Sequence, residues 1–301
     1  MLKRSLATMI LGATMAAGAA HGATLEEADA LFERRGEEYL NKSKSFEERA
    51  KIAQDAMAMY QELLPGTTGS ERAYIGSKIS RLYIYIGDYL ISKSEKSKRR
   101  DHFKACQDFI VQEMSPELLG EDNLQPYYYQ LASCWAFKLE MSNVLVQLRE
   151  KGGLERLVYE GTAYAGGTDY LAGGIHRSLA GVRSSKAAIA IGAGDVVEAR
   201  DEALAALETI ENSKYNNYSI AGTLYCDNYR YLADAYVADP NSSIYSKDEA
   251  TNVLLNAFDA LEVSGSADDF EIGYKVPGAE VDNLVCVERL FAAAAQHGLE
   301  L

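Results

Sequence analysis

Apolar residues recur at steps of three and four along most of the chain, which is the spacing of one buried helix face. Turn signals separate these segments, among them Pro65-Gly66, Ser115-Pro116 and Asp239-Pro240. No stretch alternates apolar and polar residues for long enough to predict a sheet. We therefore predict an all-α chain. The expected helices cover residues 25–40, 46–64, 74–90, 103–114, 127–139, 144–159, 175–191, 196–210, 220–237, 250–261 and 281–295.

Segments of the chain resemble one another at a spacing of about 51 residues. Residues 198–211 read EARDEALAALETIE, and residues 249–262 read EATNVLLNAFDALE. In the first half, residues 60–63 (YQEL) recur as residues 111–114 (VQEM). A repeat of this size indicates stacked helical hairpins. We predict an α-solenoid of tetratricopeptide-like helical hairpins, with a period longer than that family's usual repeat.

Polar residues that favour helix N-caps precede many of the predicted helices. They are Thr24, Ser45, Ser70, Asp195, Asn217 and Ser246. They support the helix starts that the apolar spacing indicates.

The first 23 residues have the pattern of a secretory signal peptide. Lys3-Arg4 precede a short apolar stretch, and small residues lead up to an expected cleavage after Ala23. The alternative is an ordinary N-terminal helix, which Gly12 and Gly18 disfavour. We expect residues 24–301 to form a single helical-repeat domain in the periplasm, without a membrane anchor. A Gly-rich loop is expected near residues 152–174.

The chain is acidic, with 44 Asp and Glu against 30 Lys and Arg and a net charge of −14. That balance disfavours nucleic acids and anionic membranes as partners. The basic run at residues 93–104 is mixed with acids and serines, so we interpret it as a solvated loop and helix start.

An even number of cysteines in an exported chain suggests disulfides. We favour two pairs within the two halves of the chain, and four buried thiols are the alternative. None of the three histidines outside the leader shares a helix turn with another His or Cys, so we expect no metal and no cofactor. The favoured pairs are Cys106 with Cys134 and Cys226 with Cys286.

The middle of the chain resembles the T component of tripartite ATP-independent periplasmic (TRAP) transporters. The resemblance rests on residues 127–129 (YYY), 132–136 (ASCWA), Asn143-Val144 and 173–181 (GGIHRSLAG), in that order. It covers residues 120–240, and it departs from the family at Ala180, where Gly is usual. The resemblance implies a helical-repeat accessory protein that partners a periplasmic substrate-binding protein, encloses a small-molecule ligand and forms a homotrimer.

Tyr, Trp and Arg supply the candidate ligand contacts. Arg177 lies in the first turn of a predicted helix behind Gly173-Gly174, where backbone N–H groups favour a carboxylate. The alternative is a structural ion pair for Arg177. The variant Arg177→Ala distinguishes the two roles. A ligand contact predicts weaker ligand binding with an unchanged melting temperature, and a structural ion pair predicts a large loss of stability. Tyrosine suits a pocket for an amphipathic molecule, although core packing is the ordinary role. The candidate lining is Tyr127, Tyr128, Trp135, Gly174, Arg177, Tyr225 and Tyr229.

Catalysis has little support in the sequence. Ser184, Ser185 and Lys186 resemble a Ser/Lys dyad only superficially, and no nucleophile elbow, phosphate loop or His-Glu-x-x-His motif occurs. We expect a binding protein that takes a small hydrophobic or carboxylate ligand. The alternative function is a periplasmic scaffold that binds only proteins along a concave face.

Overall fold

The computed structural model describes residues 22–39, 41, 43–164, 167–168, 170–185, 188–189, 192, 194–212, 224–274 and 279–301. The expected leader residues 1–21, the expected cap Asn217 and Lys186 lie outside these residues. The first half of the fold contains α1 (Leu25–Arg34), α2 (Phe46–Leu63), α3 (Gly69–Tyr85), the π-helical turn η1 (Ile86–Leu90), α4 (Lys96–Glu113), α5 (Pro116–Leu119), the 3₁₀ turn η2 (Glu121–Asn123) and α6 (Gln125–Glu140). The second half contains α7 (Val144–Thr162), α8 (Gly174–Ser184), α10 (Val196–Asn212), α11 (Cys226–Val237), α12 (Lys247–Ala260), β1 (Val263–Ser266), β2 (Asp269–Ile272) and α13 (Glu280–His297).

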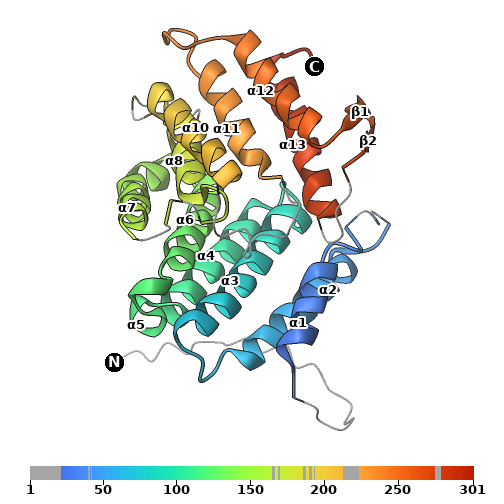
Figure 1. Ribbon diagram of the computed structural model, residues 1–301, viewed down its shortest axis with the longest axis vertical. Helices are drawn as coiled ribbons and strands as arrows, with labels where there is room; N and C mark the ends of the chain where they lie inside the picture. Colours follow the sequence, from blue (N-terminus) through green and yellow to red (C-terminus); the bar gives the residue numbers. More distant parts are fainter. Residues whose placement is uncertain are drawn as a thin grey trace.

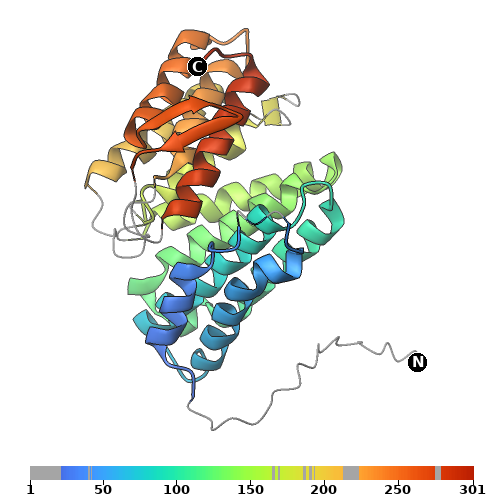
Figure 2. The ribbon, with the colours of Figure 1, turned by 90° about the vertical axis from the view of Figure 1, so that its right-hand side faces the viewer.

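The described chain is all-α apart from one small hairpin, and its helices form two layers (Figures 1 and 2). The inner layer runs through α3, α6, α8, α11 and α13, each packed on the next. The helices α4, α7, α10 and α12 each pack against two consecutive inner helices. The curve brings the chain back on itself, because Gly36, just after α1, lies directly against Val281 of α13.

Near the C-terminus, the two segments that resemble each other in sequence form the helices α10 and α12. The small face of α10 and its counterpart on α12 are buried at matching positions, for example Ala199 with Ala250 and Ala206 with Ala257. Small side chains on this face let the neighbouring helices approach closely.

The repeat in the first half has a different register from the one we read in the sequence. Tyr60 of α2 is fully buried, but Val111 of α4, which we aligned with it, is 52 % exposed. The residue that occupies the equivalent buried position is Ile110, one step earlier. The sequence match at residues 60–63 followed the polar pair Gln-Glu, which lies on the solvent face and carries no packing information.

Side-chain caps begin several helices as expected. Thr24 and Ser45 form capping boxes with Glu27 and Glu48, and the hydroxyl of Ser246 accepts from the N–H of Glu249. The carboxylate of Asp195 accepts hydrogen bonds from the first turn of α10. Ser70 is not a cap, because α3 begins one residue earlier, at Gly69.

Two local features differ from the sequence interpretation. Residues 263–272 form an antiparallel hairpin with Val263 opposite Ile272, although each strand is too short for alternation to signal it. The helix α7 runs through Gly152 and Gly153 to Thr162, so the loop before α8 is shorter than expected. Gly153 lies against the ring of Trp135, where a Cβ would be 2.9 Å from the indole edge. The glycine therefore serves close helix packing and does not break the helix.

Two disulfides tie inner helices to their neighbours, with the pairing favoured from the sequence. Cys106–Cys134 joins α4 to α6, and Cys226–Cys286 joins α11 to α13. Both bonds suit an oxidising compartment such as the periplasm. Among the described helices, none combines the length and the apolar character that a membrane span requires.

Candidate functional site: a cavity against the inner helices

Two adjacent cavities lie against the inner helices. The larger has a volume of about 380 Å³ and is bounded by α6, α7, α8, α11 and the end of α13. The smaller, of about 170 Å³, lies between η1, α6, α11 and α13. The residues that line both form the boundary between the two cavities, and they are Tyr129, Ser133, Phe137, Arg177 and Asp227. The larger volume falls in the range of sites for small organic ligands.

The larger cavity has one apolar wall and one polar wall. Side chains of α6 and α7 form the first, and α11 with the end of α13 forms the second. The first wall is mainly apolar, and its polar side chains include Glu140, Gln147 and Lys151. Leu139 and Leu154 are buried, whereas Val144 and Leu148 are about half exposed at the edge. An amphipathic small molecule is the type of ligand that such walls complement.

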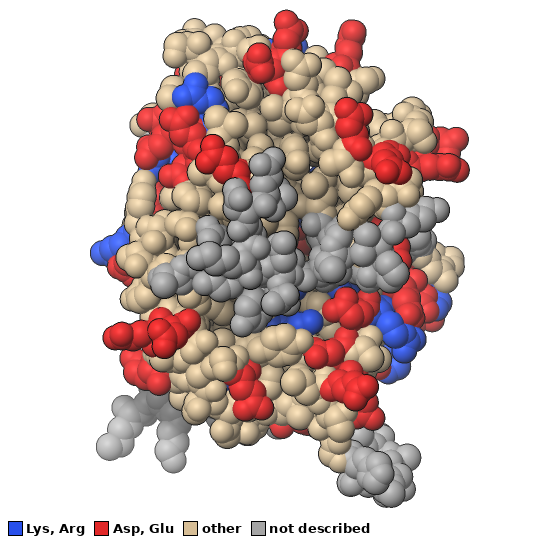
Figure 3. Space-filling model, viewed as in Figure 1, with Lys and Arg blue, Asp and Glu red and all other residues tan. Residues whose placement is uncertain are grey.

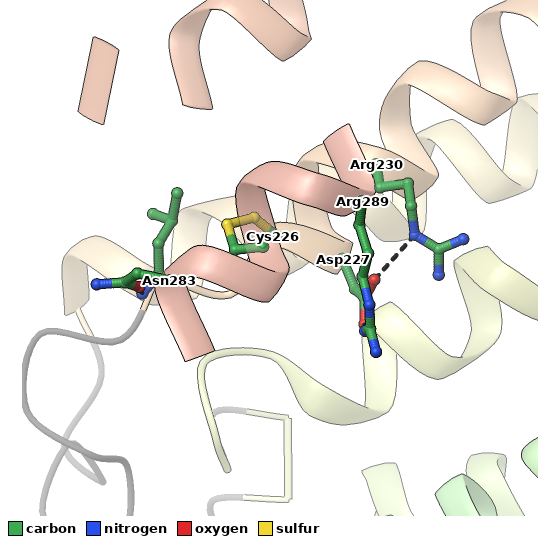
Figure 4. The surroundings of a disulfide bond; sticks show 7 residues. Cys226, Asp227, Arg230, Asn283 and Arg289 are labelled. Atoms are coloured by element: carbon green, nitrogen blue, oxygen red, sulfur yellow. Dashed lines mark hydrogen bonds and ion pairs between the residues drawn. A yellow bond between two sulfur atoms is a disulfide. The ribbon is translucent and has the colours of Figure 1, made fainter. Parts of the chain in front are cut away.

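A chain of ion pairs crosses the interior beside the smaller cavity. Arg99 contacts Asp88 at 2.9 Å, and Asp88 also pairs with Arg289 of α13. Arg289 reaches Asp227 at 3.4 Å, and Asp227 accepts a hydrogen bond of 2.9 Å from Nε of Arg230 (Figure 4). The chain therefore links η1 to the last two inner helices.

The carboxylate of Asp227 is stabilised in its charged form. Burial by itself raises the pKa of Asp227, but the nearby guanidinium groups, first that of Arg230, outweigh burial and lower the pKa to about 2. Asp227 thus stays ionised at any physiological pH and holds two arginines in place.

A second set of contacts joins the first helix to the last. The buried Arg35 contacts Asp282 at 2.6 Å, and Tyr39 donates a hydrogen bond of 3.1 Å to Glu288. With the Arg289–Asp88 pair, these contacts form what we call the closure seam: Arg35, Tyr39, Asp88, Asp282, Glu288 and Arg289. The seam holds the curved row of helices closed between α1 and α13.

Arg177 lines both cavities, but the protein itself uses four of its N–H donors. They reach the carbonyls of Leu171 and Ala172 at 3.1 Å, the side-chain oxygen of Asn228 at 2.8 Å and the hydroxyl of Tyr129 at 2.8 Å. Leu171 and Ala172 have positive φ angles, a conformation that costs L-residues about 1 kcal/mol each. Arg177 therefore clamps a strained turn in front of α8, and it does so through carbonyl, amide and hydroxyl acceptors, not through the structural ion pair that we gave as the alternative.

The other candidate lining residues divide into two groups. Tyr225 lines the smaller cavity and lies 4.8 Å from the Arg177 guanidinium, and Gly174 packs against the ring of Tyr129. Gly174 and the remaining candidates are absent from the lining of both described cavities. Tyr128 stacks on Tyr164, Trp135 donates to Glu150 at 2.9 Å, and Tyr127 and Tyr229 pack against apolar clusters. Their ligand roles stay predictions without support from the cavity geometry.

Sequence reasoning missed the polar wall. Asp227, Arg230 and Asp234 occupy steps of three and four on α11, so they share one face. That face is directed into the larger cavity, and His297 of α13 contacts Asp234 there at 2.7 Å. The sequence signal for this site is a row of charged residues along one face of α11, a helix whose other face is apolar.

Acidic residues outnumber basic ones in the chain, and acidic side chains are spread over the face in Figure 3. Within the described part of the chain, no three His, Cys, Asp or Glu side chains gather as a metal site. A scan against protein-family models finds no match, and a search of curated proteins finds no similar protein.

Proposed function

We propose that this protein is a tetratricopeptide-like α-solenoid that binds a small organic ligand in the larger cavity. The observation that carries the proposal is the contrast between the two cavity walls, mainly apolar on α6 and α7 and mainly charged on α11. A cavity of about 380 Å³ between helices is large enough to enclose most of a small molecule. Because ligands favour such concave, mainly apolar sites with a few polar groups, binding is the best-supported role.

The biological role that we propose is that of an accessory protein for solute uptake, of the TRAP transporter T-component type. The resemblance at residues 127–181 motivates the proposal. The two disulfides agree with a periplasmic location. In this role the protein docks a periplasmic substrate-binding protein and passes or receives the ligand, and it assembles as a homotrimer.

Native mass spectrometry of the protein exported to a bacterial periplasm tests both parts. A retained small molecule, together with a closed trimer, supports the proposal and begins to identify the ligand. A monomer that retains no small molecule under gentle ionisation contradicts it. A variant with Leu154→Trp, which fills the apolar wall from a buried position, serves as a matched control for occupancy of the larger cavity.

A second candidate function is a protein-binding scaffold without a small ligand. The start of α7 favours it, because Val144, Leu145 and Leu148 expose 50 %, 75 % and 43 % of their surface. Apolar residues grouped on one exposed helix turn often mark a protein contact. If this role holds, Leu145→Ser abolishes co-purification of a defined partner and leaves any ligand affinity unchanged.

A further inference from the structure

The guanidinium group of Arg230 has an edge that the described residues leave available. Its Nε donates to Asp227, and its nearest other carboxylate contact is Nη1 to Asp234 at 4.0 Å, beyond hydrogen-bond reach. Neither terminal nitrogen has a hydrogen bond to another described residue. In Figure 4 these two nitrogens point away from Asp227.

The available edge faces the larger cavity, which Arg230 lines. The side chain is held in place on its other side, since Asp227 is itself anchored by Arg289 and the guanidinium lies 4.2 Å from the ring of Tyr231. Two parallel N–H donors in a fixed plane match the two oxygens of a carboxylate. A held arginine also loses less side-chain entropy when it binds a ligand.

The charges around Arg230 favour one negative charge over two. The larger cavity is lined by three cationic side chains (Lys151, Arg177 and Arg230) and three carboxylates (Glu140, Asp227 and Asp234). These lining charges balance, in a protein whose net charge is −14. A dianionic phosphate therefore meets more repulsion from Asp227 and Asp234 than a carboxylate does.

The opposite wall supplies the second half of the ligand. Ala136, Leu139, Val144, Leu148 and Leu154 of α6 and α7 line the same cavity as Arg230. A molecule with its anionic head on α11 can place an apolar body against these side chains and remove their surface from water.

We propose that the larger cavity binds a monocarboxylate with an apolar body, and that Arg230, instead of Arg177, is the residue that recognises the carboxylate. The inference rests on the proposed function, because it names the ligand class of the same cavity. Arg177 then has the separate task of holding the turn before α8, as its four hydrogen bonds indicate.

The test is calorimetric titration of the purified protein with four probes. Octanoate has both head and body, 1-octanol lacks the charge, octylammonium reverses it, and acetate lacks the body. Octanoate is expected to bind most tightly. Equal or tighter binding of 1-octanol or octylammonium, or no binding of octanoate, overturns the proposal without the need for a variant.

Variants then assign the carboxylate contact. Arg230→Gln is expected to weaken the affinity for octanoate by about tenfold or more, because it removes a charge-assisted pair of hydrogen bonds. The affinity for 1-octanol is expected to stay unchanged. Arg230→Lys keeps the charge next to Asp227, so its affinity for octanoate is expected to lie between those of the unaltered protein and Arg230→Gln. Unchanged octanoate affinity in folded Arg230→Gln overturns the assignment.

Arg200 provides a matched control. Its Nε contacts Asp201 at 2.9 Å and its side chain is 27 % exposed, close to the 2.9 Å and 28 % of Arg230, but it lines neither cavity. Arg200→Gln is expected to bind octanoate like the unaltered protein. If the periplasmic protein retains a ligand without a carboxylate, this inference fails and the proposed function stands. If no ligand is retained and no probe binds, both fail.

Discussion

The contacts between neighbouring helices differ in chemistry from the contact between the first and last helices. Neighbours meet through small apolar faces, such as Ala199, Ala203 and Ala206 of α10, all fully buried. The closure seam adds charged and polar groups, such as Arg35 with Asp282, to a small apolar contact at Ala279 and Val281. Neighbouring contacts are local in the sequence, whereas the paired residues of the seam are more than 200 positions apart.

The difference indicates separate physical tasks for the two regions. Burial of apolar surface stabilises the stack of helices but is not directional. Ion pairs contribute little net stability after desolvation, yet they act only at the correct alignment of partners. We infer that the apolar faces stabilise the row of helices, while the seam determines where the row closes. Four predictions follow this contrast, in order of expected effect.

Arg177→Ala is expected to have the largest effect. Arg177 is a charged residue that stabilises contacts between neighbouring helices, where the other contacts are mainly apolar. The change removes the Arg177 donor from the buried carbonyl of Leu171 and one of two donors from that of Ala172, beside a strained turn. We expect the free energy of unfolding in urea to fall by about 4 kcal/mol. Arg200→Ala, a surface control, is expected to have almost no effect. A stable Arg177→Ala protein with lost ligand affinity returns Arg177 to the ligand role.

Ile110→Ala tests the apolar contacts and the register of α4 together. Ile110 is fully buried, so its truncation is expected to cost about 3 kcal/mol of unfolding free energy. The neighbouring Val111→Ala is the matched control and is expected to change little, since Val111 is 52 % exposed. Equal losses in the two variants contradict the register that we describe.

Arg289→Met tests the seam. The change removes contacts to Asp88 and Asp227, each of which keeps another arginine, so we expect a loss of about 2 kcal/mol at low salt. Because Arg289 is partly exposed, about 1 M NaCl is expected to reduce the difference from the unaltered protein. The loss in Ile110→Ala is expected to be insensitive to salt. A salt-independent loss in Arg289→Met shows that packing, not charge, is the main contribution of this side chain.

Asp227→Asn tests the electrostatic contribution of the interior ion pairs through the pH dependence of the free energy of unfolding. The pKa of Asp227 in the folded protein is about 2, below the value of about 4 for an unfolded Asp. A lowered pKa stabilises the fold above the unfolded value, and this stabilisation is lost as the pH falls through the folded value. We expect a difference of at most about 2 kcal/mol at neutral pH that shrinks between about pH 4 and pH 2. Chemical denaturation across this range measures it, and a constant difference rejects the electrostatic role.

The positions of most helices, several of their N-caps and the disulfide pairs could be predicted from local sequence. Three- and four-residue spacing located most helices, the caps at Thr24, Ser45 and Ser246 marked their starts, and four cysteines in two halves gave the correct pairs. These signals depend on neighbours within a turn or two. The register error at Val111 arose where the matching residues face solvent, because surface identity carries no information about packing.

The candidate site was predicted only in part, for a related reason. The sequence identified Arg177 and Tyr225, which do line the cavities, but not Arg230, and it assigned Arg177 a ligand role while its donors go to the protein. Whether a guanidinium is available depends on acceptors contributed by distant helices.

The sequence by itself determined an all-α chain with repeated helices, their approximate bounds and a cysteine pattern suited to an oxidising compartment. Only the tertiary structure decided that α13 meets α1, that ion pairs join them, and that a charged stripe of α11 faces an apolar wall of α6 and α7. The physical reason is that helix formation and burial patterns are local, whereas curvature sums small rotations over the whole row of helices. The partner of each interior charge is therefore fixed only when the row closes.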